Sequence, residues 1–157
     1  NLEIEYEIVA AAEASRLQIS TQDDYGRRIA LASVDLLLLS IGEADLNPPG
    51  DLLEKIVIQE PKPKTLIQGE KLWVSGLARA SATTPLIVEL FTKDGKSLGP
   101  ARLVNLVESG LDNYSAFNVQ LSYAVDSPTW VRLTVSELSG RIPGAVHLTS
   151  IEILLSP

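Results

Sequence analysis

LASVDLLL at residues 31–38 recurs near the other end of the chain as LTSIEILL at residues 148–155. The segment before each copy also matches, as RLQIS at residues 16–20 and RLTVS at residues 132–136. A repeated sequence pattern indicates a repeated structural unit. We therefore expect one unit to be present twice, with a short form at residues 1–40 that lacks the front half of the longer form.

Apolar residues alternate with polar residues in both copies, which is the pattern of a β-strand with one face in water. In FNVQLSYAV, residues 117–125, every odd-numbered position is apolar. NLEIEYEI at the start of the chain alternates in the same way, with glutamates between its apolar residues. The alignment of these segments predicts three strands in each copy, at residues 2–9, 15–21 and 29–40 and at residues 117–125, 130–137 and 146–155.

Four further short strands are expected ahead of the second copy, separated by turns rich in Gly, Pro and Asp. Lys93-Asp94-Gly95-Lys96 is a tight hairpin turn, because Asp-Gly supplies the positive φ that such a turn requires. Seven strands in about 100 residues is typical of an immunoglobulin-like sandwich. The sequence thus predicts an all-β protein, with a partial three-stranded copy at 1–40, a Pro/Gly linker at 41–55 and a complete seven-stranded immunoglobulin-like β-sandwich at 56–157. The four added strands are predicted at residues 56–58, 71–78, 85–92 and 101–107.

Several short motifs in the second unit point to a known family. IVIQEP at residues 56–61 opens the unit, VSGLA follows at 74–78, KDGK at 93–96 comes after a central strand, and Phe117 begins the fifth strand. With these motifs, residues 56–156 resemble the immunoglobulin-like domain of bacterial spore germination proteins. The resemblance implies a non-catalytic module of the bacterial cell envelope, located outside the cytoplasm, and it supplies no catalytic residues.

Composition excludes several kinds of partner. The chain has 13 Lys and Arg against 20 Asp and Glu, for a net charge of −7. Nucleic acids and anionic membranes need clustered positive charge, so we expect neither as a partner. The longest apolar run, at residues 34–39, is far below the ~20 residues that span a bilayer, so we expect no direct membrane insertion. The chain contains no Cys and no Met, and the lack of Met predicts a piece of a longer product.

His147 is the only histidine and begins the last predicted strand. A catalytic histidine needs a nucleophile beside it and a group that orients its ring. The loop residues Ser109 and Ser115 could act as that nucleophile only if the fold happened to bring them to His147, and the sequence pattern does not indicate that it does. Glycine-rich phosphate loops, nucleophile elbows and metal-spaced His or carboxylate sets are not present in the sequence. We therefore expect no enzyme, no catalytic residue and no cofactor, and keep a hydrolase that uses His147 as an alternative.

Acidic residues in predicted loops raise a calcium hypothesis. Asp23-Asp24 lies in the hairpin loop of the first copy, and Asp112-Asn113 lies in a loop of the second unit. Calcium requires six or more oxygen ligands from converging loops, and no Asp-x-Asp-x-Asp-Gly run is present. We favour solvated turn residues, because Asp and Asn are common in turns, and expect no metal site.

Trp73 and Trp130 are the large side chains most relevant to binding. Each lies on the strand face opposite its apolar neighbours. Two exposed indoles on one face would form a sugar-binding platform or an interface anchor. Burial between the sheets is the interpretation that we favour, and these two residues are the candidate ligand or interface contacts.

The partial copy at residues 1–40 needs a partner, because three strands with apolar faces leave open edges and apolar surface in water. Upstream residues could complete it, two chains could exchange strands in a homodimer, or it could dock on the complete domain and extend it. We expect completion by another chain or by an upstream segment. The function predicted is a non-catalytic tandem module of a bacterial cell-envelope or secreted protein that acts in binding, adhesion or assembly; the alternative is a carbohydrate-binding accessory domain of a larger enzyme.

Overall fold

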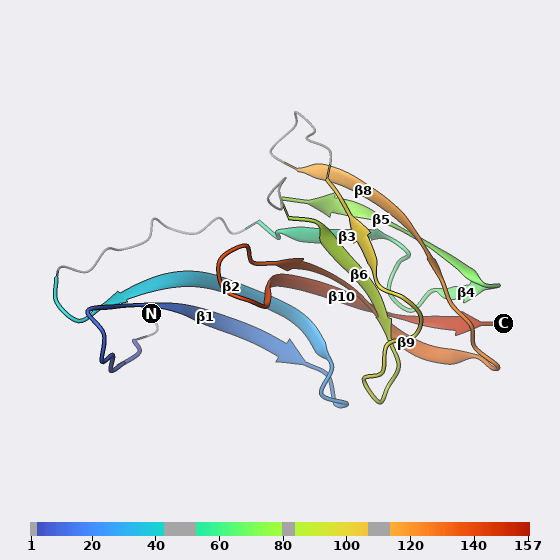
Figure 1. The fold of residues 1–157 in the computed structure, drawn as a ribbon. Helices are drawn as coiled ribbons and strands as arrows, with labels where there is room; N and C mark the ends of the chain where they lie inside the picture. Colours follow the sequence, from blue (N-terminus) through green and yellow to red (C-terminus); the bar gives the residue numbers. More distant parts are fainter. Residues whose placement is uncertain (1–2, 43–52, 80–83, 107–113) are drawn as a thin grey trace.

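A computed structural model describes residues 3–42, 53–79, 84–106 and 114–157 of the chain (Figure 1). The described residues form strands, turns and irregular segments and no helix. Accordingly, no helix among them is long and apolar enough to cross a membrane. The strands are β1 (Ala12–Gln22), β2 (Arg28–Leu39), β3 (Ile56–Glu60), β4 (Leu66–Gln68), β5 (Lys71–Ala78), β6 (Leu86–Phe91), β7 (Arg102–Val104), β8 (Ser115–Ser122), β9 (Thr129–Leu138) and β10 (Ala145–Ser156).

Two sheets stack to form a β-sandwich. The larger sheet has the order β1-β2-β10-β9-β6-β7, and β4 pairs in parallel with the C-terminal end of β10. The smaller sheet has the order β3-β5-β8. All neighbouring strands except β4 and β10 are antiparallel. The predicted all-β sandwich is therefore confirmed, and its strand order is consistent with an immunoglobulin-like domain.

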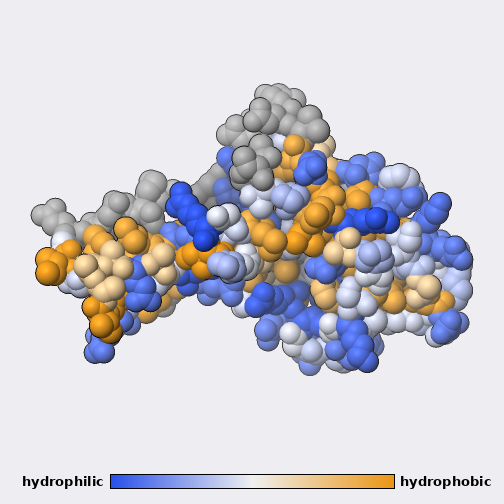
Figure 2. Space-filling model, in the orientation of Figure 1, coloured by the Kyte–Doolittle hydropathy of each residue, from blue (hydrophilic) through white to orange (hydrophobic). Residues whose placement is uncertain are grey.

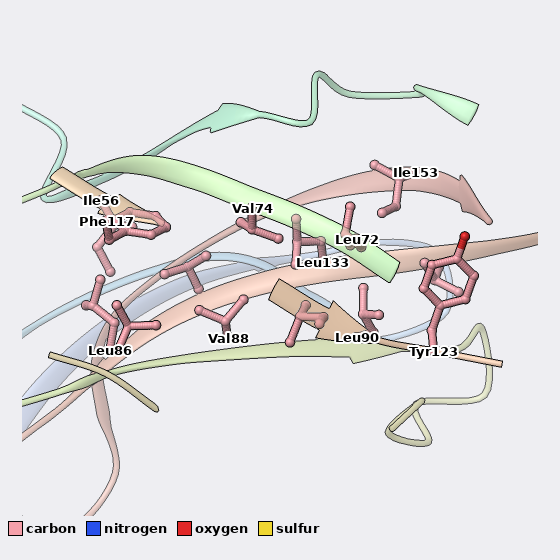
Figure 3. Packing of buried hydrophobic residues seen from close by; sticks show 14 of the residues in the cluster. Ile56, Leu72, Val74, Leu86, Val88, Leu90, Phe117, Tyr123, Leu133 and Ile153 are labelled. Atoms are coloured by element: carbon pink, nitrogen blue, oxygen red, sulfur yellow. The ribbon is translucent and has the colours of Figure 1, made fainter. Parts of the chain in front are cut away.

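The core lies between the two sheets and comes from the alternation that the sequence predicted. On β9, Val131, Leu133 and Val135 point inward and are fully buried, as are Leu72 and Val74 on β5. Figure 3 shows Leu72, Val74 and Leu133 meeting in one layer between the strands. Each such aliphatic side chain contributes about 1.5–3 kcal/mol by leaving water, so this layer holds the two sheets together.

All seven strands predicted from Ile56 onward are present, and the structure adds one more, β4. β4 has three residues, which is too few to show a period of two, so its sequence gave no strand pattern. Its register follows from pairing with β10, where Leu66 lies opposite Leu154.

The N-terminal region differs from the prediction. The strands expected at 15–21 and 29–40 form as β1 and β2, but the strand expected at 2–9 is wrong for residues 3–8, which form no regular structure. Alternation makes a segment competent for a strand, but backbone pairing requires a neighbouring edge, and no described strand pairs with these residues. The predicted linker falls largely outside the described residues, which omit 43–52.

The β1–β2 hairpin joins the larger sheet. Ala30, Leu31 and Ala32 of β2 pair with Thr149, Leu148 and His147 of β10, so the base of the hairpin extends the complete sheet. Three routes were considered for completing the first copy. For this part of the hairpin the structure shows the third route, docking on the complete domain. The aligned residues of the two copies also pair in the same register: Leu17 lies opposite Val34 and Leu133 opposite Ile151, while Ile19 lies opposite Ala32 and Val135 opposite Thr149.

Candidate functional site

The outer part of the β1–β2 hairpin, which we call the arm (residues 12–19 and 32–39), projects beyond the sandwich (Figure 1). Three residues of β2 pair with β10. Beyond them, β1 and β2 continue as a two-stranded ribbon in which they pair with each other. In Figure 2 apolar surface gathers at this end of the molecule. Among the described residues, nine of the fourteen exposed large apolar side chains lie between residues 4 and 41: Ile4, Tyr6, Val9, Ile19, Tyr25, Val34, Leu37, Leu39 and Ile41.

The arm has an apolar inner face that continues the buried face of the larger sheet. Ala32 lies beside His147 of β10, and residues of the same parity farther along β10, such as Ile153, point into the core. The inner face of the arm therefore carries the apolar residues Leu17, Ile19, Ala32, Val34, Leu36 and Leu38, with Ser15 and Glu13 toward its outer end. Ile19 is 64% exposed and Val34 is 41% exposed, so the smaller sheet does not cover this face.

A groove lies where the base of the arm meets the smaller sheet, and we call it the arm groove. It has a volume of about 380 Å³ and is lined by residues 19–21 and 30–32 of the hairpin, by 53–56 at the start of β3, and by 147–149 of β10. Among the described residues β3 pairs only with β5, so its other backbone edge is unpaired. The arm groove thus combines apolar side chains with an open strand edge, which are the two features that bind an added β-strand.

A buried ionic cluster holds the turn of the hairpin on the outer face of the larger sheet. Asp23 Oδ2 accepts hydrogen bonds from Arg27 Nε at 2.8 Å and from Arg132 Nε at 3.1 Å. The Arg27 guanidinium also forms an ion pair with Glu152 at 3.0 Å. Burial raises the pKa of Asp23, but hydrogen bonds from Arg27 and from the backbone of Tyr25 outweigh it, and the pKa lies below its ordinary value.

A second ionic contact fixes the arm farther out. Arg16 Nε donates to Asp35 Oδ1 across the hairpin at 2.8 Å, and its Nη2 donates to the carbonyl of Ile142 at 2.6 Å. Ser139 Oγ donates to the other oxygen of Asp35 at 3.0 Å. The hydrogen bond from Arg16 is the main reason that the pKa of Asp35 is lowered. The arm is therefore held at defined points by the loop between β9 and β10.

The hairpin turn also contacts the β6–β7 turn. The ring of Tyr25 lies between Arg27 and Lys93, with their cationic groups 5.3 Å and 5.2 Å from its centroid. A cavity of about 420 Å³ lies beside this contact and is lined by Arg27, Arg132 and Glu89. Two of its three arginines, Arg27 and Arg132, already pair with Asp23 and Glu152, and Glu89 balances the charge of Arg28, so the cavity has no excess positive charge to select an anion.

The two tryptophans are not brought together. Trp73 is 61% exposed on β5 and points away from the core, because Leu72 and Val74 point into it. Trp130 is half-buried on β9 of the other sheet and is likewise opposite the inward-pointing Val131. The rings therefore lie on outer faces of opposite sheets, and this separation does not provide the shared platform of the carbohydrate-binding alternative.

His147 has an orienting partner. Its Nδ1 lies 3.0 Å from Glu137 Oε2, and Glu137 is buried. Within the described residues, Glu137 is the one side chain hydrogen-bonded to the ring. Ser115 belongs to β8 in the other sheet, and Ser109 falls outside the described residues. The structure thus supplies the orienting group that the hydrolase alternative needs, and among the residues it describes no hydroxyl is hydrogen-bonded to the His147 ring.

The acidic loop residues also have structural roles where they are described. Asp23 binds two arginines, Asp24 is exposed, and Asp112 falls outside the described residues. In the described parts of the chain, no three His, Cys, Asp or Glu side chains come together as a metal site. Sequence reasoning missed the partners of Asp23, because Arg132 is 109 positions away along the chain.

Comparison with known proteins adds no family. No family model matches the chain, and no curated protein matches it. The resemblance of residues 56–156 to the spore germination domain therefore stays a prediction, and the arm with its groove is the feature on which a function can be based.

Proposed function

We propose that the chain is a non-catalytic β-sandwich module of a bacterial cell-envelope or secreted protein, and that it acts in protein assembly through the arm. The observation that supports this proposal is the inner face of the arm, where Ile19 and Val34 are exposed on a strand pair that continues the core layer. A two-stranded ribbon on its own is marginally stable in water, so an arm of this kind gains stability from a covering partner.

The ionic contacts support the same function. Asp23 with Arg132, and Arg16 with the carbonyl of Ile142, attach the hairpin to the sandwich at two places along its length. An arm that is held in one orientation loses less conformational entropy when a partner binds, which favours affinity. The location in the envelope or outside the cell rests on the resemblance of residues 56–156 to the germination-protein domain.

The mass of the full chain in solution tests the assembly function. We expect light scattering across a dilution series to show association, and Val34→Glu to weaken it at least about tenfold, because a charge at the centre of an apolar contact must be desolvated. Gln18→Glu is the matched control, since Gln18 is exposed on the opposite face of the same arm.

Two outcomes contradict this proposal. One is a chain that remains monomeric up to its highest soluble concentration. The other is association that Val34→Glu and Gln18→Glu weaken equally, since that would place the contact away from the inner face of the arm.

A further inference from the structure

The arm groove has the chemistry of a missing strand position. On one side, β3 begins at Ile56, and its edge that is unpaired among the described residues offers backbone donors and acceptors. On the other side, the inner face of the arm offers Ile19 and Ala32, and Ile56 of β3 is already buried in the core beside them. A strand added at this edge would pair with β3 and place alternate side chains against the arm.

The chain itself contains a segment of matching pattern. Residues 3–8 alternate between glutamates and apolar residues, as strands with one wet face do, and Val9 follows them. In the structure they belong to no strand, and their large apolar side chains are in water: Ile4 and Tyr6 are each 53% exposed and Val9 is fully exposed. The segment thus has apolar surface to bury and backbone groups to pair, and the arm groove offers a partner for both.

We propose that residues 3–9 of one copy of the chain dock in the arm groove of a second copy, where they add a strand to the free edge of β3. Ile4, Tyr6 and Ile8 then cover the inner face of the arm, and Glu3, Glu5 and Glu7 face water. The proposal rests on the proposed assembly function and names its partner as a second copy.

Chain length favours a second copy over the same chain. A bend at residues 9–11 leads into Ala12, the first residue of β1, at the far end of the arm from the groove. From Ala12 to Ile19 the arm is about seven residues long, or about 23 Å at 3.3 Å per residue. Residues 9 back to 2 span about the same distance, so in the same chain only the first residues would reach the groove. Ile4 and Tyr6 would stop short of it.

Charge also favours this site. The chain has a net charge of −7, so an acidic segment is repelled by most of its surface. At the groove, Lys55 precedes Ile56, whose side chain points into the core, so Lys55 lies on the outer side of the strand edge. The Arg79 N–H donates to the carbonyl of Lys55 at 2.7 Å, which places Arg79 on the β5 side of β3 and away from the unpaired edge. Lys55, with Glu54 next to it, is therefore the cation that an outward glutamate of the docked strand would meet.

Crosslinking between two differently tagged copies tests the proposal. The sequence contains no Cys, so the introduced cysteines are the only thiols that can react. One copy carries Tyr6→Cys and the other carries Ile19→Cys, and the mixture is treated with a short bifunctional thiol reagent. We expect a mixed adduct about tenfold more abundant than with Ser127→Cys as the second site. The reason is that docking brings the thiols to an effective concentration near the millimolar range. Ser127 is exposed in the turn between β8 and β9, at the opposite end of the sandwich (Figure 1).

Light scattering on segment variants provides the second measurement. Tyr6→Glu should weaken association at least about tenfold, while Glu5→Gln, on the water-facing side, should leave it within about twofold. Because residues 3–8 belong to no strand, neither change unfolds the sandwich.

Three results separate this proposal from the assembly function. Association that persists in Tyr6→Glu, with no mixed adduct, overturns the proposal and leaves the arm as an interface for another contact. A monomer in which a Tyr6→Cys/Ile19→Cys double variant crosslinks within one chain also overturns it, in favour of docking in the same chain. A monomer with neither crosslink overturns both the proposal and the assembly function.

Discussion

The β9–β10 hairpin and the β1–β2 hairpin have matching sequences and the same register, yet they lie in opposite environments. Val135 of β9 is fully buried, while Ile19, the aligned residue of β1, is 64% exposed. Both residues point to the same side of the same sheet. The difference is that β3, β5 and β8 form a second layer over β9 and β10, and no described strand does so over the arm.

This difference shows that the sequence pattern specifies the strand and its faces, whereas burial depends on the layer opposite. The amount of stability that each apolar residue adds should follow the layer and not the pattern. Aligned substitutions in the two hairpins can therefore separate the two contributions.

The largest expected contrast is between Leu133→Ala and Leu17→Ala. Leu133 is fully buried between the sheets, so its truncation should lower the free energy of unfolding by about 2–5 kcal/mol. Leu17, at the aligned position, is only half-buried, and the same change should cost less than about 1 kcal/mol. Urea unfolding followed by tryptophan fluorescence measures both, at a concentration where the chain is monomeric.

Equal losses in the two variants would contradict the contrast, because they would mean that the arm is covered within a single chain. If the loss of unfolding free energy in Leu17→Ala grew with protein concentration, the contrast would be supported further, since a partner chain would then supply the missing layer.

A smaller contrast is expected for added volume. Gly76 on β5 has no room for a side chain: a Cβ there would overlap the carbonyl of Val57 and approach the Phe117 ring to 2.6 Å. Gly76→Ala should cost about 1–3 kcal/mol or more, because the packed layer must shift. Gly140, in the loop beside the arm, has open space around its Cβ position, and Gly140→Ala should leave the unfolding free energy within about 0.5 kcal/mol.

Thermal or urea unfolding of the two glycine variants checks this prediction. If Gly76→Ala has the stability of the parent chain, then β3 and β5 are less closely packed than the structure indicates.

Much of the fold could be predicted from the sequence, since a period of two and Asp-Gly turns are local signals. They located seven of the eight strands of residues 56–157 and both strands of the hairpin. They failed at residues 3–8, where the pattern is present but a partner edge is not, and at β4, which is too short to show a pattern.

The candidate site was harder to predict, because it depends on contacts between distant residues. Arg27 and Glu152 pair across 125 positions, and the arm groove combines residues of β1, β2, β3 and β10. The tryptophans illustrate the same limit. Alternation predicted that Trp73 and Trp130 point away from their apolar neighbours, but only the sheet topology shows that they belong to opposite sheets.

The smallest expected effect is a selective loosening of the hairpin in acid. The pKa values of Asp23 and Asp35 lie below their ordinary value of 3.8 in the folded protein, so the folded state holds these protons less tightly than the unfolded state. Their stabilisation is complete above pH 3.8 and is lost as the pH falls through the lowered values. Amide hydrogen exchange, corrected for the intrinsic pH dependence of the exchange rate, should show β1 and β2 losing protection in that range before β9 does. Simultaneous loss in all three strands would show instead that the ionic contacts support the whole sandwich and not the attachment of the arm.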